Sequence, residues 1–413
     1  MRSVTFVITW FAVVGLIAAR AADAPRTFLL SAPALVAAKA SLDRGEPGLQ
    51  PALVALRAEA DRALARPARS VMDKTTTAST GDKHDYFSYG PYWWPDPAKP
   101  NGLPYIRRDG EINPAARQGC DDQEFSRLTT AVDTLSLAYW FTRDERYAEQ
   151  AAKLARVWFL EPATRMNPNL EHAQAIPGIN DGRGIGIIES RRLATIAESL
   201  SLLAGSRAWA SADQEAFRTW LAAFYSWLTT SKNGRDEHGE LNNHGSWYDF
   251  QSAHLALQLD RRDDVKKILT EGLTLRLASQ VQPDGSQPRE LARTKSFDYS
   301  LFNLEALFGC AQLARHVGVD WWSFATPDGR SLRAALNYVA PYMDPHLEWP
   351  KKDLHDADRT RLVPLVDLML QHGEDASLRR VYEKFSETSG ADARWRLTEN
   401  RPFARAAARP AGP

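Results

Sequence analysis

Residues 241–250 read LNNHGSWYDF and set polar, chemically active side chains beside large aromatic ones. Asn242, Asn243 and His244 fit poorly in an apolar core, because each buried polar group needs a hydrogen-bond partner. An imidazole can remove a proton, and an amide can donate to an oxygen that gains negative charge. Asn and Gly also form ordinary turns, so this stretch alone leaves a chemical site and a surface loop both open.

A second group of candidates lies in PDGSQPRELARTKSFDYSLFNLEAL, residues 283–307. Arg293 and Tyr299 are close enough in sequence to reach one site from a loop and from the start of a helix. Arg289 offers a second guanidinium four residues earlier. Taken singly, Tyr299 is equally typical of a core tyrosine with a satisfied hydroxyl.

Two long loops carry further candidates: HDYFSYGPYWWPDPAKPNGLPYIRRDGEINP, residues 84–114, and EHAQAIPGINDGRGIGIIES, residues 171–190. Aromatic faces stack on sugar rings, and guanidinium groups pair with carboxylates, which suits an acidic polysaccharide. The alternatives are that the aromatics pin the loop to the core and that the arginines pair with Asp109 and Glu111. The glycines of the second loop lack nucleotide-motif spacing. The candidate substrate-binding residues are Tyr86, Tyr89, Trp93, Trp94, Arg107, Arg108, Asn180, Arg183, Asn242, Trp247, Tyr248 and Arg289.

Composition and termini limit the classes of protein. The 413 residues include 51 basic and 51 acidic ones, which argues against a nucleic-acid or membrane-surface binder. The N-terminus carries Arg2, then the apolar run VTFVITWFAVVGLIA, and then several small residues. This pattern predicts that residues 1–24 are a signal peptide that is cleaved. The mature protein is therefore expected to be exported, either to the periplasm or out of the cell. Cys120 and Cys310 would be permitted to form a disulfide there, which the sequence leaves open.

Helical periodicity dominates residues 25–400, and strand-like alternation is scarce. Ser211 and Gln214 resemble a capping box that opens a helix. Successive helices joined by loops predict an all-α fold of antiparallel hairpins in one domain, stacked as a solenoid or closed as a toroid, with a flexible tail at 401–413. The expected helices run through 128–139, 147–158, 193–200, 217–228, 250–259, 263–280, 300–317, 331–343, 359–371 and 377–387.

Together the polar candidates suit β-elimination on a chain of uronic acids. A base removes the C5 proton, the C4 glycosidic oxygen leaves, and donors must stabilise the enediolate that develops at the carboxylate. Asn243 and Arg293 can donate to that oxygen. His244 can act as the base, and Tyr299 can protonate the leaving oxygen or act as the base once it is a phenolate.

The motifs DYFSYGPYWWPDP, LPYIRRDGEINP, NNHGSWYD and ELARTKSFDY resemble the alginate-lyase-like superfamily of bacterial polysaccharide lyases. The nearest resemblance is to polysaccharide lyase family 38, over about residues 80–350, and a more distant one is to family 5. The resemblance implies an (α/α) toroid and an acidic polysaccharide substrate. It also implies Asn243, His244, Arg293 and Tyr299 as catalytic residues. The Arg-to-Tyr interval is one residue shorter than in family 5, which leaves Arg289 as the alternative arginine.

Two other classes of protein remain open. A glycoside hydrolase needs two carboxylates at the bond, and the sequence offers Asp181, Glu189, Asp249 and Glu290. A non-catalytic polysaccharide-binding protein would need only the aromatics and arginines. No cofactor or metal is expected, because His84, Asp85, His172 and His238 lack metal-ligand spacing and arginine can neutralise the uronate.

Overall fold

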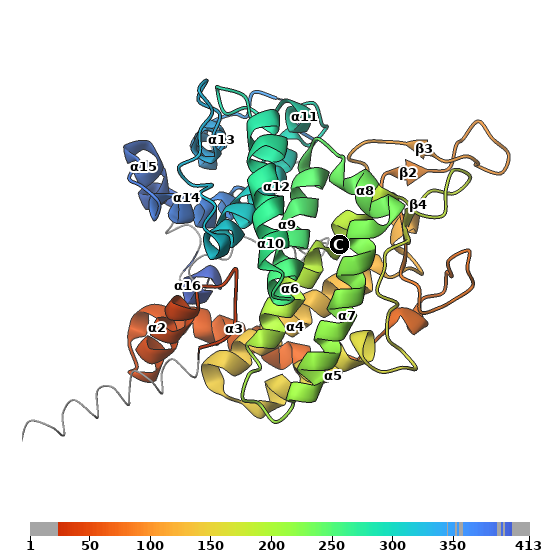
Figure 1. Cartoon of the computed structure of the whole chain (residues 1–413), viewed down its shortest axis with the longest axis horizontal. Helices are drawn as coiled ribbons and strands as arrows, with labels where there is room; N and C mark the ends of the chain where they lie inside the picture. Colours follow the sequence, from red (N-terminus) through yellow and green to blue (C-terminus); the bar gives the residue numbers. More distant parts are fainter. Residues whose placement is uncertain are drawn as a thin grey trace, which may run out of the picture.

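The computed structural model describes residues 24–344, 346–351, 353–354, 358–385, 390 and 393–398. The predicted signal peptide, apart from Ala24, and the predicted tail at 401–413 lie outside these residues. Helices make up most of the described chain (Figure 1). They are α2 (Ala32–Asp43), α3 (Gln50–Leu64), α4 (Asp122–Thr142), α5 (Glu145–Phe159), α6 (Arg192–Ser201), α7 (Ser211–Thr230), α8 (Lys232–His238), α9 (Asn243–Gln258), α10 (Arg262–Gly272), α11 (Pro288–Leu291), α12 (Ser296–Ala314), α13 (Leu332–Val339), α14 (Val363–Leu370), α15 (Ala376–Phe385) and α16 (Trp395–Thr398).

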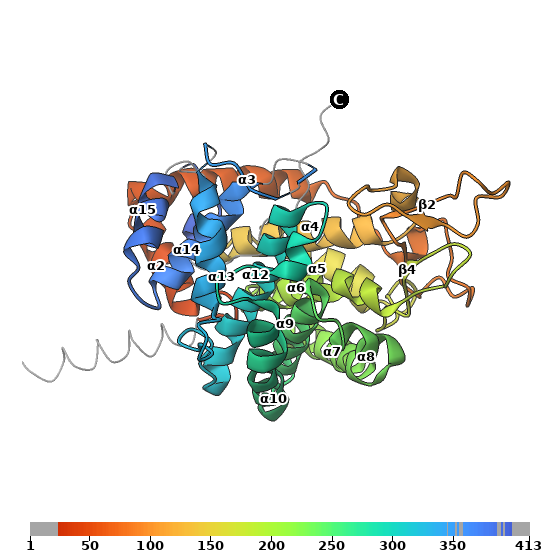
Figure 2. The same ribbon diagram turned by 90° about the horizontal axis from the view of Figure 1, so that it is seen from above.

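The helices form an inner and an outer layer, which confirms the predicted all-α fold of helical hairpins. Helices α4, α6, α9 and α12 pack side by side as the inner row, and α5, α7, α10 and α13 pack against its outside. Figure 1 shows α9, α10 and α12 side by side in the middle of the view, and Figure 2 shows α10 at the outer edge, with α9 and α12 further in. Helix α16 packs on α2 and α3, so the last described helix returns to the first ones. This is the arrangement of an (α/α) toroid.

The side-chain pattern explains the two layers. Outer helix α5 is amphipathic and buries Tyr147, Ala151, Leu154 and Trp158 at helical spacing. Inner helix α9 is covered on all sides, and His244 is the one residue of this fully described helix that is not buried. Helix α12 is buried in the same way except at Asp298, Tyr299 and Phe302 near its start. Both inner helices therefore expose a candidate catalytic side chain at their first turns.

The predicted capping box at Ser211 and Gln214 is wrong. Helix α7 begins at Ser211, and the Asp213 carboxylate accepts the backbone N–H of Ala210 at 3.0 Å. A carboxylate suits this position because the helix N-terminus carries partial positive charge. The Gln214 side chain instead accepts the Trp209 indole N–H at 2.8 Å.

Four short strands organise the two long loops. Strands β1 (Phe87–Tyr89) and β4 (His172–Ala175) pair in parallel and join the loops to each other. Strands β2 (Trp93–Trp94) and β3 (Ile106–Arg107) form an antiparallel pair that lies at one side of the helices (Figure 1). The loops are thus ordered structures fixed beside the toroid.

Neither cysteine is in a disulfide. Cys120 and Cys310 are both free thiols, and Cys310 is buried in α12. Among the described helices, none combines the length and the apolar character needed to cross a membrane.

A buried ion pair fixes α9 to its neighbours. The Asp249 carboxylate accepts from Arg276 Nε at 2.8 Å and Nη2 at 3.0 Å, and both side chains are almost inaccessible to solvent. Arg276 also donates to the carbonyls of His238 and Glu240, at 2.7 and 2.9 Å. One guanidinium therefore holds α9 and the turn that leads into it.

Replacing Asp249 by Ala should lower the free energy of unfolding by about 3–5 kcal/mol, because it leaves the Arg276 charge buried and unpaired. Denaturant unfolding measures this loss. Asp43→Ala, which removes the exposed pair with Lys39, is the control and should cost less than about 1 kcal/mol. Equal losses in the two variants would contradict the anchoring role of Asp249.

Candidate active site

The stretch that contains Asn243 and His244 is the buried start of α9, not a surface loop. Asn242 is the N-cap, and its side chain accepts the backbone N–H of His244 at 2.9 Å. This hydrogen bond satisfies one of the donors that a helix start leaves unpaired. The helix was predicted only from residue 250, because a helix buried on every side has no amphipathic pattern in its first turns.

Asn243 is held by a buried carboxylate on α11. Glu290 accepts the Asn243 backbone N–H and its side-chain Nδ2, each at 2.7 Å. The Asn243 Oδ1 atom is buried and has no hydrogen-bond partner among the described residues. An unpaired buried acceptor of this kind is costly, because nothing replaces the hydrogen bond that it would make with water.

A second buried carboxylate orients His244. Glu237 Oε1 lies 2.8 Å from His244 Nδ1, and the Glu237 side chain is wholly buried, whereas that of His244 is 15% exposed. A carboxylate at Nδ1 favours the tautomer that leaves Nε2 free to accept a proton. Burial raises the pKa of Glu237, and the interaction with His244 opposes this rise.

Arg293 and Tyr299 form the other half of the site. Arg293 Nη2 donates to the Tyr299 hydroxyl at 2.7 Å, and the guanidinium carbon lies 3.7 Å from the centre of the tyrosine ring. Asp109 accepts from Arg293 Nε and Nη2, at 3.1 and 2.7 Å. The Tyr299 hydroxyl donates to the Tyr92 hydroxyl at 2.9 Å. Burial and the neighbouring Tyr92 raise the pKa of Tyr299 above its ordinary value, so Tyr299 is a protonated phenol at neutral pH.

Glu290 connects the two halves. Burial raises the pKa of Glu290, whereas its hydrogen bonds with Asn243 and its electrostatic interactions with Arg293 and His244 lower it. The carboxylate is thus close to both pairs.

Helices α9 and α12 begin at the same end of the toroid, because α10 reverses the chain direction between these two helices. This brings His244 and Tyr299 to one face.

The long loops complete that face. Arg183 donates to the Gln174 carbonyl and side-chain oxygens, at 3.2 and 2.8 Å, and lies 5.9 Å from the Trp93 ring. Burial and the nearby Arg107 lower the pKa of Arg183 to about 10. Gly184 packs so closely on α8 that a Cβ would lie 3.1 Å from the Glu237 nitrogen. The loop at residues 171–190 therefore connects the aromatic loop, residues 84–114, to helix α8, which carries Glu237.

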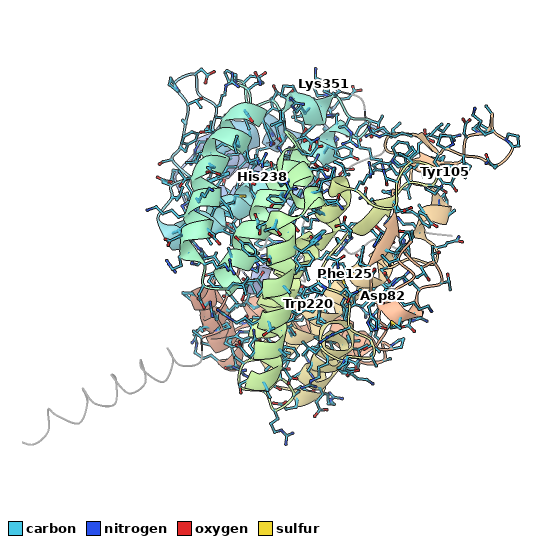
Figure 3. The ribbon with its side chains drawn as sticks, turned by 45° about the vertical axis from the view of Figure 1, so that its right-hand side comes forward. Asp82, Tyr105, Phe125, Trp220, His238 and Lys351 are labelled. Atoms are coloured by element: carbon cyan, nitrogen blue, oxygen red, sulfur yellow. The ribbon has the colours of Figure 1, made fainter. Side chains whose placement is uncertain are left out.

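The predicted loop residues occupy different positions around the site. Trp93 and Trp94 are partly exposed on β2, and Tyr89 and Asn180 are also partly exposed. Arg107 is exposed and pairs with Asp109 at 2.7 Å, as the solvated-pair alternative predicted. Figure 3 shows Tyr105 on the loop that projects from the helical body, between β2 and β3.

Three predicted substrate-binding residues are core residues instead. Tyr86 is inaccessible and donates its hydroxyl to Glu189 at 2.8 Å. Trp247 and Tyr248 are buried on α9, where Tyr248 donates to the Leu228 carbonyl at 3.1 Å. These side chains have no surface for a sugar, because the inner helix is covered on all sides.

The alternative arginine is not part of the site. Arg289 is exposed on α11 and makes no hydrogen bond or ion pair with the described residues, whereas Arg293 contacts Tyr299. Sequence reasoning also missed Glu237 as a partner of His244 and Tyr92 as a partner of Tyr299. Tyr92 stands in the aromatic loop that was recognised, but no local pattern marks Glu237.

The carboxylates proposed for a hydrolase are mostly engaged in structural contacts. Glu189 accepts from Tyr86 and Ser88, while Asp249 binds Arg276 and Glu290 binds Asn243. Within the described part of the chain, no cluster of three or more His, Cys, Asp or Glu side chains is arranged to hold a metal ion.

The helical toroid and the paired Asn–His and Arg–Tyr side chains define a polysaccharide lyase. A model of the alginate lyase family matches residues 70–349. The crystal structure of an alginate lyase from Bacteroides ovatus is 37% identical, covers 91% of this chain and 99% of its own, and superimposes with a TM-score of 0.86. The chain belongs to the alginate lyase family.

More distant structures are also similar. Alginate lyase A1-III from Sphingomonas species A1 is 16% identical with a TM-score of 0.45, covering 78% of this chain and 88% of its own. A variant of that enzyme complexed with a tetrasaccharide is 15% identical with a TM-score of 0.48, covering 79% and 88%. No protein of curated function matches the chain by sequence.

Replacing Arg293 by Ala should slow the lyase reaction by about 100-fold or more, the usual cost of losing a donor to a developing negative charge. Arg289→Ala is the matched control on the same segment and should leave the rate within about twofold, because exposed side chains without partners contribute little. Initial rates of both variants measure the difference. A larger loss in Arg289→Ala would reassign the catalytic arginine.

Proposed function

We propose that this protein cleaves a 1,4-linked polyuronate, such as alginate or glucuronan, by β-elimination and leaves a 4,5-unsaturated uronate at the new non-reducing end. The observation that carries this proposal is the contact between Arg293 and the Tyr299 hydroxyl, on the face that also presents His244. The Bacteroides ovatus relative is described as an alginate lyase, which supports the same substrate class.

The reaction begins at the substrate carboxylate. Arg293 Nη1 makes no hydrogen bond within the described structure, so its N–H groups remain for the uronate. Asn243 Nδ2 has one further N–H beside the one given to Glu290. These donors stabilise the enediolate that forms when C5 loses its proton.

His244 and Tyr299 then move the protons. His244 Nε2 takes the C5 proton, and the electrons of the C5–H bond form the C4–C5 double bond as the C4–O4 bond breaks. Tyr299, which is protonated at neutral pH, gives its proton to O4. Glu237 stabilises the resulting imidazolium and Arg293 the phenolate, and solvent returns the proton from His244 to Tyr299.

Two other functions have less support. Three of the carboxylates that could serve hydrolysis already bind other side chains: Glu189 accepts from Tyr86, Asp249 pairs with Arg276, and Glu290 accepts from Asn243. A protein that only binds polysaccharide would not need the buried Glu237 that orients His244. The apolar N-terminal run supports export to the periplasm or beyond as part of this proposal.

Ultraviolet absorbance tests the proposal, because elimination creates a conjugated double bond that hydrolysis does not. Incubation with polymannuronate, polyguluronate or glucuronan should raise the absorbance with one of the three polymers. Tyr299→Phe should reduce the rate by about 100-fold or more, since it removes the proton donor. Tyr342→Phe, whose hydroxyl has no partner among the described residues, is the control and should keep the rate. New reducing ends without absorbance would establish hydrolysis instead.

A further inference from the structure

A cavity of about 440 Å³ opens beside the catalytic face and contains none of the four predicted catalytic residues. It lies between the end of the aromatic loop and the start of α12. Its lining consists of Trp94, Gly110, Glu111, Ile112, Lys295 and Leu354.

Thr294 connects the chain segments that line the cavity to Arg293. The Thr294 hydroxyl donates to the Asp109 carbonyl at 3.0 Å, and Asp109 in turn binds Arg293. Gly110 and Lys295 are the next residues along the two chain segments, and both line the cavity. Gly110 has a φ of +77°, and a Cβ there would lie 2.3 Å from the Thr294 hydroxyl, so the segments can approach only with glycine at this position. Lys295, on the cavity wall, is thus only two residues after Arg293.

Trp94 gives the cavity a fixed aromatic wall. The Arg108 guanidinium lies 4.9 Å from the centre of the Trp94 ring, and the indole N–H donates to the Glu111 carbonyl at 3.1 Å. Ile112 and Leu354 are exposed apolar side chains at 43% and 40% of their full accessibility. Aromatic and apolar surfaces of this kind pack against the C–H face of a sugar ring.

Lys295 supplies positive charge to the same space. Its ammonium group forms no ion pair with any carboxylate of the described residues, whereas Arg107 and Arg293 both pair with Asp109. Among the described residues, Glu111 is the one acidic side chain in the lining. A carboxylate that binds here would therefore gain attraction from Lys295 and meet repulsion from Glu111.

We propose that this cavity is a second uronate-binding subsite, in which Lys295 pairs with the carboxylate of a sugar unit that is not cleaved and Trp94 packs against its ring. The inference rests on the proposed function, because it assumes a polyuronate substrate. The subsite holds a longer chain in register with Arg293 and Tyr299, so it strengthens the binding of polymer and contributes nothing to the smallest substrate.

The test compares Lys295→Met and Glu111→Gln with the wild-type protein on a polyuronate and on the shortest oligouronate that is cleaved. Lys295→Met should raise KM for the polymer by about tenfold, the effect of losing about 1.4 kcal/mol of binding. Glu111→Gln should lower the same KM, because it removes repulsion. Neither variant should change kcat or the constants for the shortest oligomer. Lys153→Met, which removes an exposed lysine on α5, controls for net charge.

The outcomes separate the subsite from the proposed function. If the wild-type protein produces double bonds and Lys295→Met behaves like Lys153→Met, the subsite is refuted and the lyase function stands. Equal changes on polymer and shortest oligomer, or changes of the same sign in Lys295→Met and Glu111→Gln, would also refute it. If the wild-type protein produces no double bonds, calorimetric binding of an oligouronate decides the subsite, which requires weaker binding by Lys295→Met.

Discussion

The buried start of α9 is the constraint on which the rest of the site depends. A helix start leaves backbone donors unpaired, and here water cannot satisfy them because the helix is the centre of the inner row. Glu290 accepts from Asn243, Glu237 binds His244, and Asp249 binds the Arg276 guanidinium that also holds the preceding turn. Glu290 and Glu237 therefore hold the first turn of α9 and fix the orientation of the candidate catalytic side chains, while Asp249, in the second turn, holds the turn that precedes the helix.

In this arrangement, each side chain uses some of its atoms for contacts within the protein and keeps others for the proposed reaction. The atoms used for support are Nδ1 of His244, one N–H of Asn243, and Nε and Nη2 of Arg293. In the proposed reaction, the atoms left for substrate are His244 Nε2, the remaining Asn243 N–H and Arg293 Nη1. Because each supporting contact is made by a buried or half-buried partner, the site is organised before a ligand arrives, which is what stabilisation of a developing charge requires.

Sequence patterns predicted helices of both layers and named the four catalytic candidates, but they did not predict the first turns of α9 or the contacts that hold the candidates in place. Tyr147 and Trp158 belong to a clear helical period of apolar residues, because one face of α5 is exposed to solvent. The first turns of α9 have no such period, because they are buried on all sides. Glu237 is seven residues before His244, and only the turn between α8 and α9 brings them together. Tyr86 and Trp247 were misassigned because an aromatic residue type serves a core and a sugar site equally well.

A double-mutant cycle between His244→Ala and Tyr299→Phe tests most directly whether the two inner helices present one catalytic unit. If His244 and Tyr299 move protons in the same step, each single change should remove most of the rate, and the double variant should be about as slow as the slower single one. If instead the two losses in activation free energy add fully, the residues act independently. That result would contradict the central claim that the starts of α9 and α12 form a single site.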